Sequence, residues 1–433
     1  MNLFKLISAR AAFARNLGGA VISQGLLSVI NLSIGLILIR RVSHAQYGYY
    51  VLIAATAPLL VQFQNSLIAP LLTSRVTTAS DDERKDYVGG LMREQRRLLA
   101  IVTTVGLLGC LLIWLGGRVP TETLIVLLAG VVASIGALFR DFMRIILITY
   151  RRPYDVLRTD VVYALVFVGG VWVSTLSGIP AALSALAMAS GAIASGLLLA
   201  RVLRRMDPWH TPGMRGAFSQ SVVLGLWSAT GAVIHWVFQQ GYTYIVALQL
   251  DVTAVAAIAA TRLLLSPLGV FSLGINSLMF STSTLWLKHH GPRGLMRRVL
   301  VFALGMACMG LVYVAVMWWM RDWIFLHILK RDYPQRDLLL GIWSMVFICT
   351  VIRDQVIYLQ MARGHFKRLA GLTALCAVLG LSVTLLSIRH YGAAGGLLGL
   401  FAGELLHVIG VLVLAIRDLR ETSMKSNDLP ALS

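Results

Sequence analysis

The stretch Phe139–Leu157, FRDFMRIILITYRRPYDVL, decides the fold class of this chain. Its first half is typical of the end of a membrane-spanning helix, and its second half is typical of a basic loop at the water edge. Three charged residues, Arg140, Asp141 and Arg144, lie within the apolar half. Because charged side chains are costly inside a bilayer, charges at this position predict a functional element.

A near copy of this stretch occurs later in the chain, at Ile352–Leu369, IRDQVIYLQMARGHFKRL, where Arg353–Asp354 repeats the Arg-Asp pair. Downstream of the two pairs, Arg151–Arg205 aligns with Arg363–Arg417 without gaps. Two halves of the same topology would be related by a pseudo-two-fold axis along the membrane normal. Transporters built in this way bind their substrate between the halves, so the repeat predicts a duplicated transporter core.

The composition excludes an ordinary soluble protein. Hydrophobic residues make up 58% of the chain and charged residues only 13%, whereas soluble proteins carry roughly 25% charged residues. Apolar windows of about 20 residues, long enough to cross a bilayer as helices, recur from end to end. The net charge of +19 comes from basic residues scattered over short loops. This pattern favours contact with anionic membrane lipids over nucleic-acid binding.

We therefore predict an all-α integral membrane protein with about 12 transmembrane helices in two six-helix lobes. The expected parts are an N-terminal lobe at residues 1–205, a cytoplasmic inter-lobe loop at 206–219, a C-terminal lobe at 220–420 and a disordered cytoplasmic tail at 421–433. Lysine and arginine concentrate in the segments that are cytoplasmic if the N-terminus is, so both termini are expected in the cytoplasm. The basic segment Arg321–Asp337 is an exception, explained either by a short interfacial helix or by a slip in the helix register.

Arginines inside the predicted spans are the candidate substrate-binding cations. Arg140 and Arg144 are spaced i, i+4 and share one helix face, and Asp141 can pair with Arg144 at i, i+3. Because the guanidinium fork matches two phosphate oxygens, Arg140, Arg144 and Arg353 predict a cationic cavity for a lipid pyrophosphate. The alternative is an Arg-Asp network that fixes the two halves together, with Asp141 and Asp354 orienting or neutralising the arginines.

Arg262 stands alone in its predicted span, a few residues before Ser266–Pro267. The proline is expected to kink the helix or to free a backbone carbonyl. Since no acidic residue is near it in sequence, Arg262 is a candidate for binding substrate charge.

Other polar residues in the spans have two interpretations each. Gln62, Asn65 and Gln239 suit sugar hydroxyls, although interhelical hydrogen bonding is the commoner role of such residues. Glu404 and His407, spaced i, i+3, form either a proton site or a polar packing pair. The sequence contains no Gly-rich phosphate loop, metal-ligand cluster or nucleophile motif, so we expect no catalytic residue, metal or cofactor.

Three stretches carry a resemblance to a known family. They are Asn31–Ala55, NLSIGLILIRRVSHAQYGYYVLIAA; Arg140–Asp160, RDFMRIILITYRRPYDVLRTD; and the motif GIPAAL or YGAAGGL that closes a span in each half. In these stretches the chain resembles the polysaccharide transporters, including the O-antigen flippases, of the multidrug/oligosaccharidyl-lipid/polysaccharide flippase superfamily. The motifs are mostly apolar patterns and say little about the substrate.

This resemblance implies a twelve-helix, two-lobed transporter in the bacterial inner membrane. Its expected substrate is an undecaprenyl-pyrophosphate-linked oligosaccharide, moved to the periplasmic leaflet by alternating access for surface or exopolysaccharide assembly. Glycosyltransferases and a polymerase of the same pathway are the expected partners.

Three other functions compete with this one. A cation-coupled multidrug exporter of the same superfamily would favour acidic cavities, whereas arginines outnumber acids in the predicted spans. A membrane enzyme acting on lipid-linked sugar would need exposed polar loops or a clustered catalytic group. A non-transporting scaffold would not need intramembrane arginines.

Overall fold

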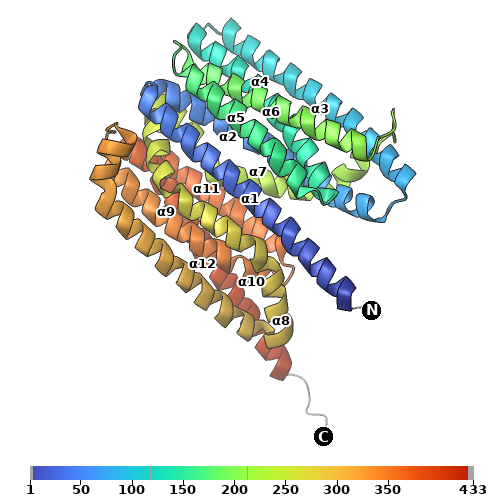
Figure 1. Ribbon diagram of the computed structural model, residues 1–433. Coiled ribbons are helices and arrows are strands. Elements are labelled where there is room, and N and C mark those ends of the chain that lie inside the picture. Colours follow the sequence, from blue (N-terminus) through green and yellow to red (C-terminus); the bar gives the residue numbers. More distant parts are fainter. Residues whose placement is uncertain (1–2, 118, 212, 428–433) are drawn as a thin grey trace. The chain divides into compact units, whose positions relative to one another are not determined.

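The computed structural model describes residues 3–117, 119–211 and 213–427, and its regular elements are helices throughout (Figure 1). The elements, in chain order, are α1 (Leu3–Arg41), α2 (His44–Thr78), α3 (Asp81–Leu115), α4 (Thr121–Thr149), α5 (Pro153–Ser174), α6 (Pro180–Met206), α7 (Ala217–Gln249), α8 (Val252–Trp323), the π-helix η1 (Ile324–Leu329), α9 (Arg336–Val356), α10 (Tyr358–Met361), α11 (Phe366–Tyr391) and α12 (Ala393–Asn427).

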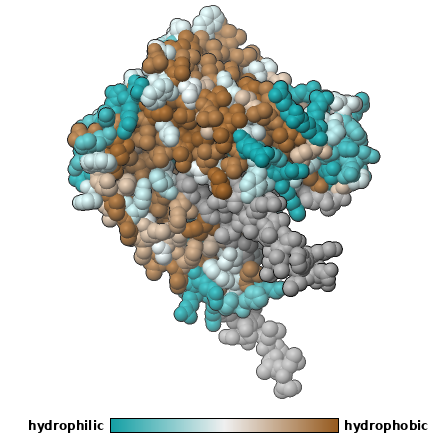
Figure 2. Space-filling model, viewed as in Figure 1, coloured by the Kyte–Doolittle hydropathy of each residue, from teal (hydrophilic) through white to brown (hydrophobic). Residues whose placement is uncertain are grey.

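The membrane prediction is confirmed by the length and polarity of these helices. Within the described residues, 11 helical segments are long and apolar enough to cross a bilayer. Many large apolar side chains point outward, such as Leu112 of α3, which is 69% exposed. Figure 2 shows such residues covering much of the visible face, with hydrophilic residues gathered toward its margins. An apolar surface of this extent is suited to lipid rather than water.

The chain forms two compact units, Met1–Val233 and Ile234–Ser433, whose boundary falls inside α7. α12 continues to Asn427, and residues 428–433 of the predicted tail lie outside the described residues.

The segment between α6 and α7 is held against α3 of the first unit. The His210 N–H donates to the Lys85 carbonyl at 3.3 Å, and the Met214 N–H donates to the Asp86 carbonyl at 2.8 Å. This approach requires glycine at position 89, because a Cβ atom there would lie 2.0 Å from the His210 carbonyl oxygen.

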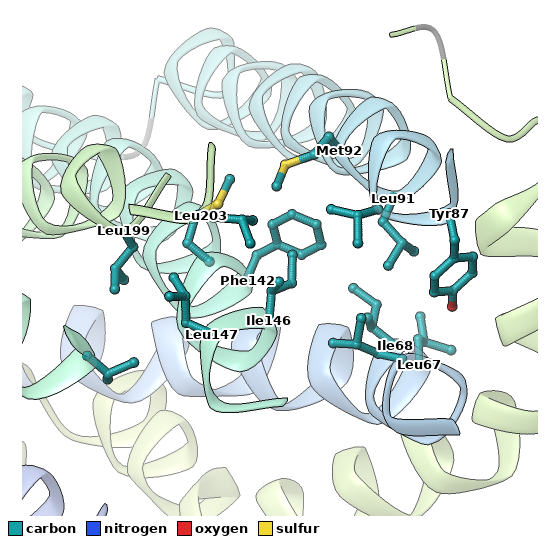
Figure 3. Packing of buried hydrophobic residues seen from close by; sticks show 14 of the residues in the cluster. Leu67, Ile68, Tyr87, Leu91, Met92, Phe142, Ile146, Leu147, Leu199 and Leu203 are labelled. Atoms are coloured by element: carbon teal, nitrogen blue, oxygen red, sulfur yellow. The ribbon is translucent and has the colours of Figure 1, made fainter. Parts of the chain in front are cut away.

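The core of the first unit is built around α4. Phe142 and Ile146 of α4 are fully buried between side chains of three neighbouring helices (Figure 3). These are Leu67 and Ile68 of α2; Tyr87, Leu91 and Met92 of α3; and Leu199 and Leu203 of α6. This packing fixes the face that α4 turns toward each neighbour, and thereby the directions of its charged residues.

The long helix α8 contains a kink at Gly291, which has φ 63° and ψ −175°, and it also contains Pro267. Pro267 has no N–H to donate to the Leu263 carbonyl one turn earlier. The Ser266 hydroxyl donates to that carbonyl at 2.7 Å instead. The proline therefore frees a carbonyl, which was one of its two predicted effects. The hydroxyl of the preceding serine satisfies that carbonyl.

The internal repeat is visible in two turns of identical hydrogen bonding. After α4, the Arg152 N–H donates to the Leu147 carbonyl. After α10, the His365 N–H donates in the same way to the Gln360 carbonyl. This contact defines a Schellman turn, whose left-handed residue is usually glycine. In the second turn that residue is Gly364, with φ 75°, but in the first it is Arg151, with φ 57°.

Candidate functional site

Asp160 of α5 is the centre of the polar network in the first unit. Its fully buried carboxylate accepts a hydrogen bond from Arg140 Nη2 at 2.5 Å, and Arg144 Nε lies 3.6 Å from its other oxygen. The Arg140 guanidinium also lies over the Tyr163 ring, 3.9 Å from the ring centroid. One carboxylate thus serves two arginines, so these three groups together keep a net positive charge.

Asp141 does not pair with Arg144, and the sequence expectation was wrong on this point. Its carboxylate accepts a hydrogen bond from Asn65 Nδ2 of α2. Successive side chains on a helix point about 100° apart, so Asp141 cannot face α5 together with Arg140. Within the described part of the chain, Asp141 forms no ion pair.

Ser23 ties α1 to the same network. Its hydroxyl donates to Asp160 and accepts from Arg144 Nη2 at 3.0 Å. Sequence reasoning missed both Ser23 and Asp160, because Asp160 lies near the expected start of its span, where a charge normally faces water. The signal that could have identified Asp160 was the pair of neighbouring arginines, which needed a carboxylate partner.

Amide side chains continue the network into α2 and α3. Gln95 Nε2 donates to Gln64 Oε1 at 3.0 Å, and Gln64 Nε2 donates to the Leu138 carbonyl at 3.2 Å. Gln64 and Gln95 are buried, whereas Gln62 is exposed. Of the two amides predicted for sugar binding in this unit, Gln62 is therefore accessible and Asn65 is engaged with Asp141.

The second unit reverses this balance of charge. Arg353 Nη1 donates to Glu404 Oε1 of α12, and Arg353 Nη2 donates to Asp354 Oδ1, both at 2.8 Å. Gln239 Nε2 of α7 also donates to Glu404, at 2.6 Å. The structure thus gathers four of the predicted site residues, and here two carboxylates share one arginine.

The Asp–Asn contact is common to the two units. Asp354 accepts from Asn276 Nδ2 of α8 at 3.0 Å, as Asp141 accepts from Asn65. Asn276 was missed by sequence reasoning, since its stretch of α8 shows no charged repeat. The repeated Arg-Asp pairs therefore sit in related frameworks, but their arginines turn to different helices.

His407 packs beside this cluster, and in the described part of the chain it makes no hydrogen bond to Glu404. His407 Nε2 lies 3.3 Å from the Thr373 hydroxyl, and its ring meets the Phe238 ring edge to face at 5.8 Å. Glu404 Oε2 is buried and has no hydrogen-bond partner. In the described residues no group of three or more His, Cys, Asp or Glu side chains is placed to hold a metal ion.

Arg262 of α8 differs from the other intramembrane arginines, because it forms no ion pair in the described part of the chain. Its guanidinium lies 5.3 Å from the centroid of the Trp343 ring, and its Nη1 is 3.5 Å from Gln240 Oε1. Trp343 is itself fixed, since its Nε1 donates to the Ile258 carbonyl at 3.0 Å. The half-buried Arg262 thus has an aromatic ring and an amide beside it, and its charge is not neutralised.

Comparisons with known proteins find solved structures of similar fold. No family model matches the chain, and no curated protein matches its sequence. A solved inward-facing structure of a multidrug resistance MATE family transporter of the MOP superfamily is similar, with TM-score 0.75, 14% identity, and 94% of this chain and 96% of that chain covered. At such identity the likeness shows the fold alone.

Two further structures have the same fold. The lipid II flippase MurJ, in its inward closed conformation, matches with TM-score 0.70, 13% identity, and 94% of this chain and 90% of that chain covered. A MOP superfamily transporter from Pyrococcus furiosus, described as having a binding pocket of reverse polarity, matches with TM-score 0.67, 14% identity, and 96% of each chain covered. The fold is therefore shared by drug transporters and a lipid flippase.

Proposed function

We propose that this protein is a flippase of the O-antigen type that moves an undecaprenyl-pyrophosphate-linked oligosaccharide across the bacterial inner membrane by alternating access. The observation that carries the proposal is Arg262, an intramembrane guanidinium that has no carboxylate partner among the residues that the structure describes. A charged side chain inside a bilayer carries a high free-energy cost unless an anion neutralises it. A diphosphate supplies that anion, and the neighbouring half-buried Gln240 suits a sugar hydroxyl.

The paired arginines enter this proposal in a different way. Arg140, Arg144 and Arg353 already contact carboxylates. For them to bind phosphate, the substrate must displace a carboxylate from the guanidinium. Arg262 is therefore the first contact for the diphosphate in this proposal, and Arg353 of the same unit is a later contact.

A multidrug exporter is the second candidate, and a specific observation favours it. In the second unit Asp354 and Glu404 share the single Arg353, and Glu404 Oε2 has no hydrogen-bond partner. A surplus carboxylate suits a coupling cation or a cationic drug. The similar MATE transporter is described as a multidrug resistance protein. An enzyme acting on lipid-linked sugar has less support, because the similar structures described above are transporters and a flippase.

The two candidates are separated by reconstituting the purified chain in proteoliposomes. A lipid-linked oligosaccharide is placed in both leaflets, and its accessibility to an added glycosidase is measured with and without protein. The flippase proposal expects the protein to make the inner-leaflet sugar accessible. No such exposure, together with transport of a cationic dye under an imposed cation gradient, would favour the exporter. Glycosyltransferases and a polymerase are proposed partners that this assay does not require.

A further inference from the structure

The two repeat-related turns lead into helix starts that carry an outward aromatic side chain. Tyr154, at the start of α5, is 42% exposed, and Phe366, at the start of α11, is 51% exposed. The next apolar residue of the repeat in the second unit, Leu369, is buried. We call the segments at residues 151–158 and 363–368 the first and second corner. Each corner turns one aromatic ring outward although a buried apolar face is available on the same helix.

Basic side chains surround both rings. In the first corner Arg151, Arg152 and Arg158 are exposed, and Asp155 is the one acidic residue among them. Asp155 lies 3.9 Å from Arg152 and 3.8 Å from Arg158, so it contacts both only loosely. The first corner therefore combines an exposed ring with surplus positive charge.

In the second corner Lys367 and Arg368 are exposed. Asp418 of α12 contacts Arg368 at 3.0 Å and the half-buried Arg363 at 3.3 Å. Asp418 thus pairs with its arginines more closely than Asp155 does in the first corner, where the two distances are 3.9 Å and 3.8 Å. We therefore expect the first corner to bind an external anion more strongly than the second.

Arg151 distinguishes the first corner further. It occupies the left-handed position of its turn, where the second corner has Gly364. A non-glycine residue is strained in that conformation. The Arg151 side chain is exposed, and within the described residues it makes no ion pair. The chain thus tolerates an unfavourable backbone conformation for a residue whose cation has no ion-pair partner in the described part of the chain.

From these observations we infer that the first corner is a binding site for the headgroup of an anionic phospholipid. α4 and α5 are apolar helices that meet at this turn, so its arginines lie at the depth where lipid phosphates lie. Tyrosine is a typical residue of the membrane–water interface, and arginine binds phosphate through two donors at once. The partner is therefore an anionic lipid of the surrounding bilayer, and the inference does not depend on the transported substrate.

The test measures the thermal stability of the purified full chain in detergent with added phosphatidylglycerol, and with phosphatidylcholine as the zwitterionic reference. The variants are Arg151→Gly, the double variant Arg151→Gly/Arg158→Gln, and Arg96→Gln as a matched control. Arg96 is an exposed arginine of α3, outside both corners. A lipid that binds the folded state raises its melting temperature.

We expect Arg151→Gly without lipid to melt at or above the parent temperature, because glycine removes the left-handed strain. The extra melting-temperature rise given by phosphatidylglycerol over phosphatidylcholine should fall by at least half in the double variant and stay intact in Arg96→Gln. An unchanged rise in the double variant would overturn the inference, and so would an equal loss in Arg96→Gln. If the double variant does not fold, Arg158→Gln alone must reduce the rise. No transport is measured, so failure here is distinct from failure of the proposed function.

Discussion

At the scale of single residues, Asp160 is the group on which the first unit's charge arrangement depends. It is completely buried and serves Arg140, Arg144 and Ser23. Removing one partner of a buried ion pair leaves an uncompensated charge. Asp141, on the neighbouring helix, offers the matched contrast, since it holds only an amide contact.

We therefore expect Asp160→Asn to lower the free energy of unfolding by about 3–5 kcal/mol, the usual cost of breaking a buried pair. Asp141→Asn should cost less than about 1.5–3 kcal/mol, the worth of a hydrogen bond to a charged group, because the asparagine oxygen can still accept from Asn65. Thermal unfolding of both variants in the same detergent measures the difference. Equal destabilisation by the two substitutions would show that the two arginines do not depend on Asp160.

At the scale of elements, the segment between α6 and α7 is a fixed part of the first unit. Backbone hydrogen bonds join it to α3, and Gly89 provides the space for them. Asp207, at the end of α6, accepts from Arg84 Nε at 2.7 Å and from the Tyr150 hydroxyl at 2.8 Å. One carboxylate thus holds the ends of α6, α4 and α3 together.

Gly89→Ala should displace this segment, because the added Cβ would meet the His210 carbonyl oxygen at 2.0 Å. We expect faster proteolysis near His210 and a lower melting temperature. Gly109→Ala in the same helix is the control, since a Cβ there meets nothing within 4 Å. Alanine at that position should raise stability slightly by helix propensity. If Gly89→Ala behaves like the control, the segment is not held at Gly89.

The Asp207 contact should also depend on pH. Burial raises the pKa of Asp207, but hydrogen bonds from Arg84 and Tyr150 outweigh it and leave the pKa below its ordinary value. A lowered folded-state pKa contributes stability above the unfolded value of about 3.9, and this stability is lost as pH falls through the folded-state pKa. Asp207→Asn should therefore melt below the parent at neutral pH, and the gap should narrow as the pH falls below about 4. A gap that persists in acid would contradict this.

The helical framework and the repeat could be predicted because they rest on apolar windows and on one duplicated Arg-Asp pair. The partners of the charges could not, because they depend on the direction in which each face of a helix points. Arg140 and Asp141 are neighbours in sequence, yet Arg140 contacts α5 and Asp141 contacts α2. Asp160, Ser23 and Asn276 come from other helices, and no spacing rule within one helix could identify them.

At the scale of the whole molecule, the two units share a plan but differ in charge. In the first unit two arginines meet one carboxylate, and in the second one arginine meets two. Arg262 adds an uncompensated cation to the second unit. Because the balance of arginines and carboxylates differs between the units, the duplicated Arg-Asp pairs do not have identical roles.

The proposed orientation makes a separate prediction. With both termini in the cytoplasm, a cysteine introduced at Lys330 should react with an impermeant thiol reagent from outside intact cells. A cysteine at Asp82 should react only after the membrane is opened. Replacing the native Cys110, Cys308, Cys349 and Cys376 by serine removes background labelling. The opposite labelling pattern would reverse the proposed topology.

The most direct test of the central claim is lipid-linked oligosaccharide flipping in proteoliposomes by the parent, Arg262→Ala, Arg262→Lys and the control Arg96→Gln. A charge-assisted hydrogen bond is worth about 1.5–3 kcal/mol, so the alanine variant should lose roughly tenfold to 100-fold of the flipping rate. Lysine keeps the charge without the two-donor fork, and it should recover part of the rate. The control should match the parent. An alanine variant that folds normally and flips at the parental rate would contradict the account.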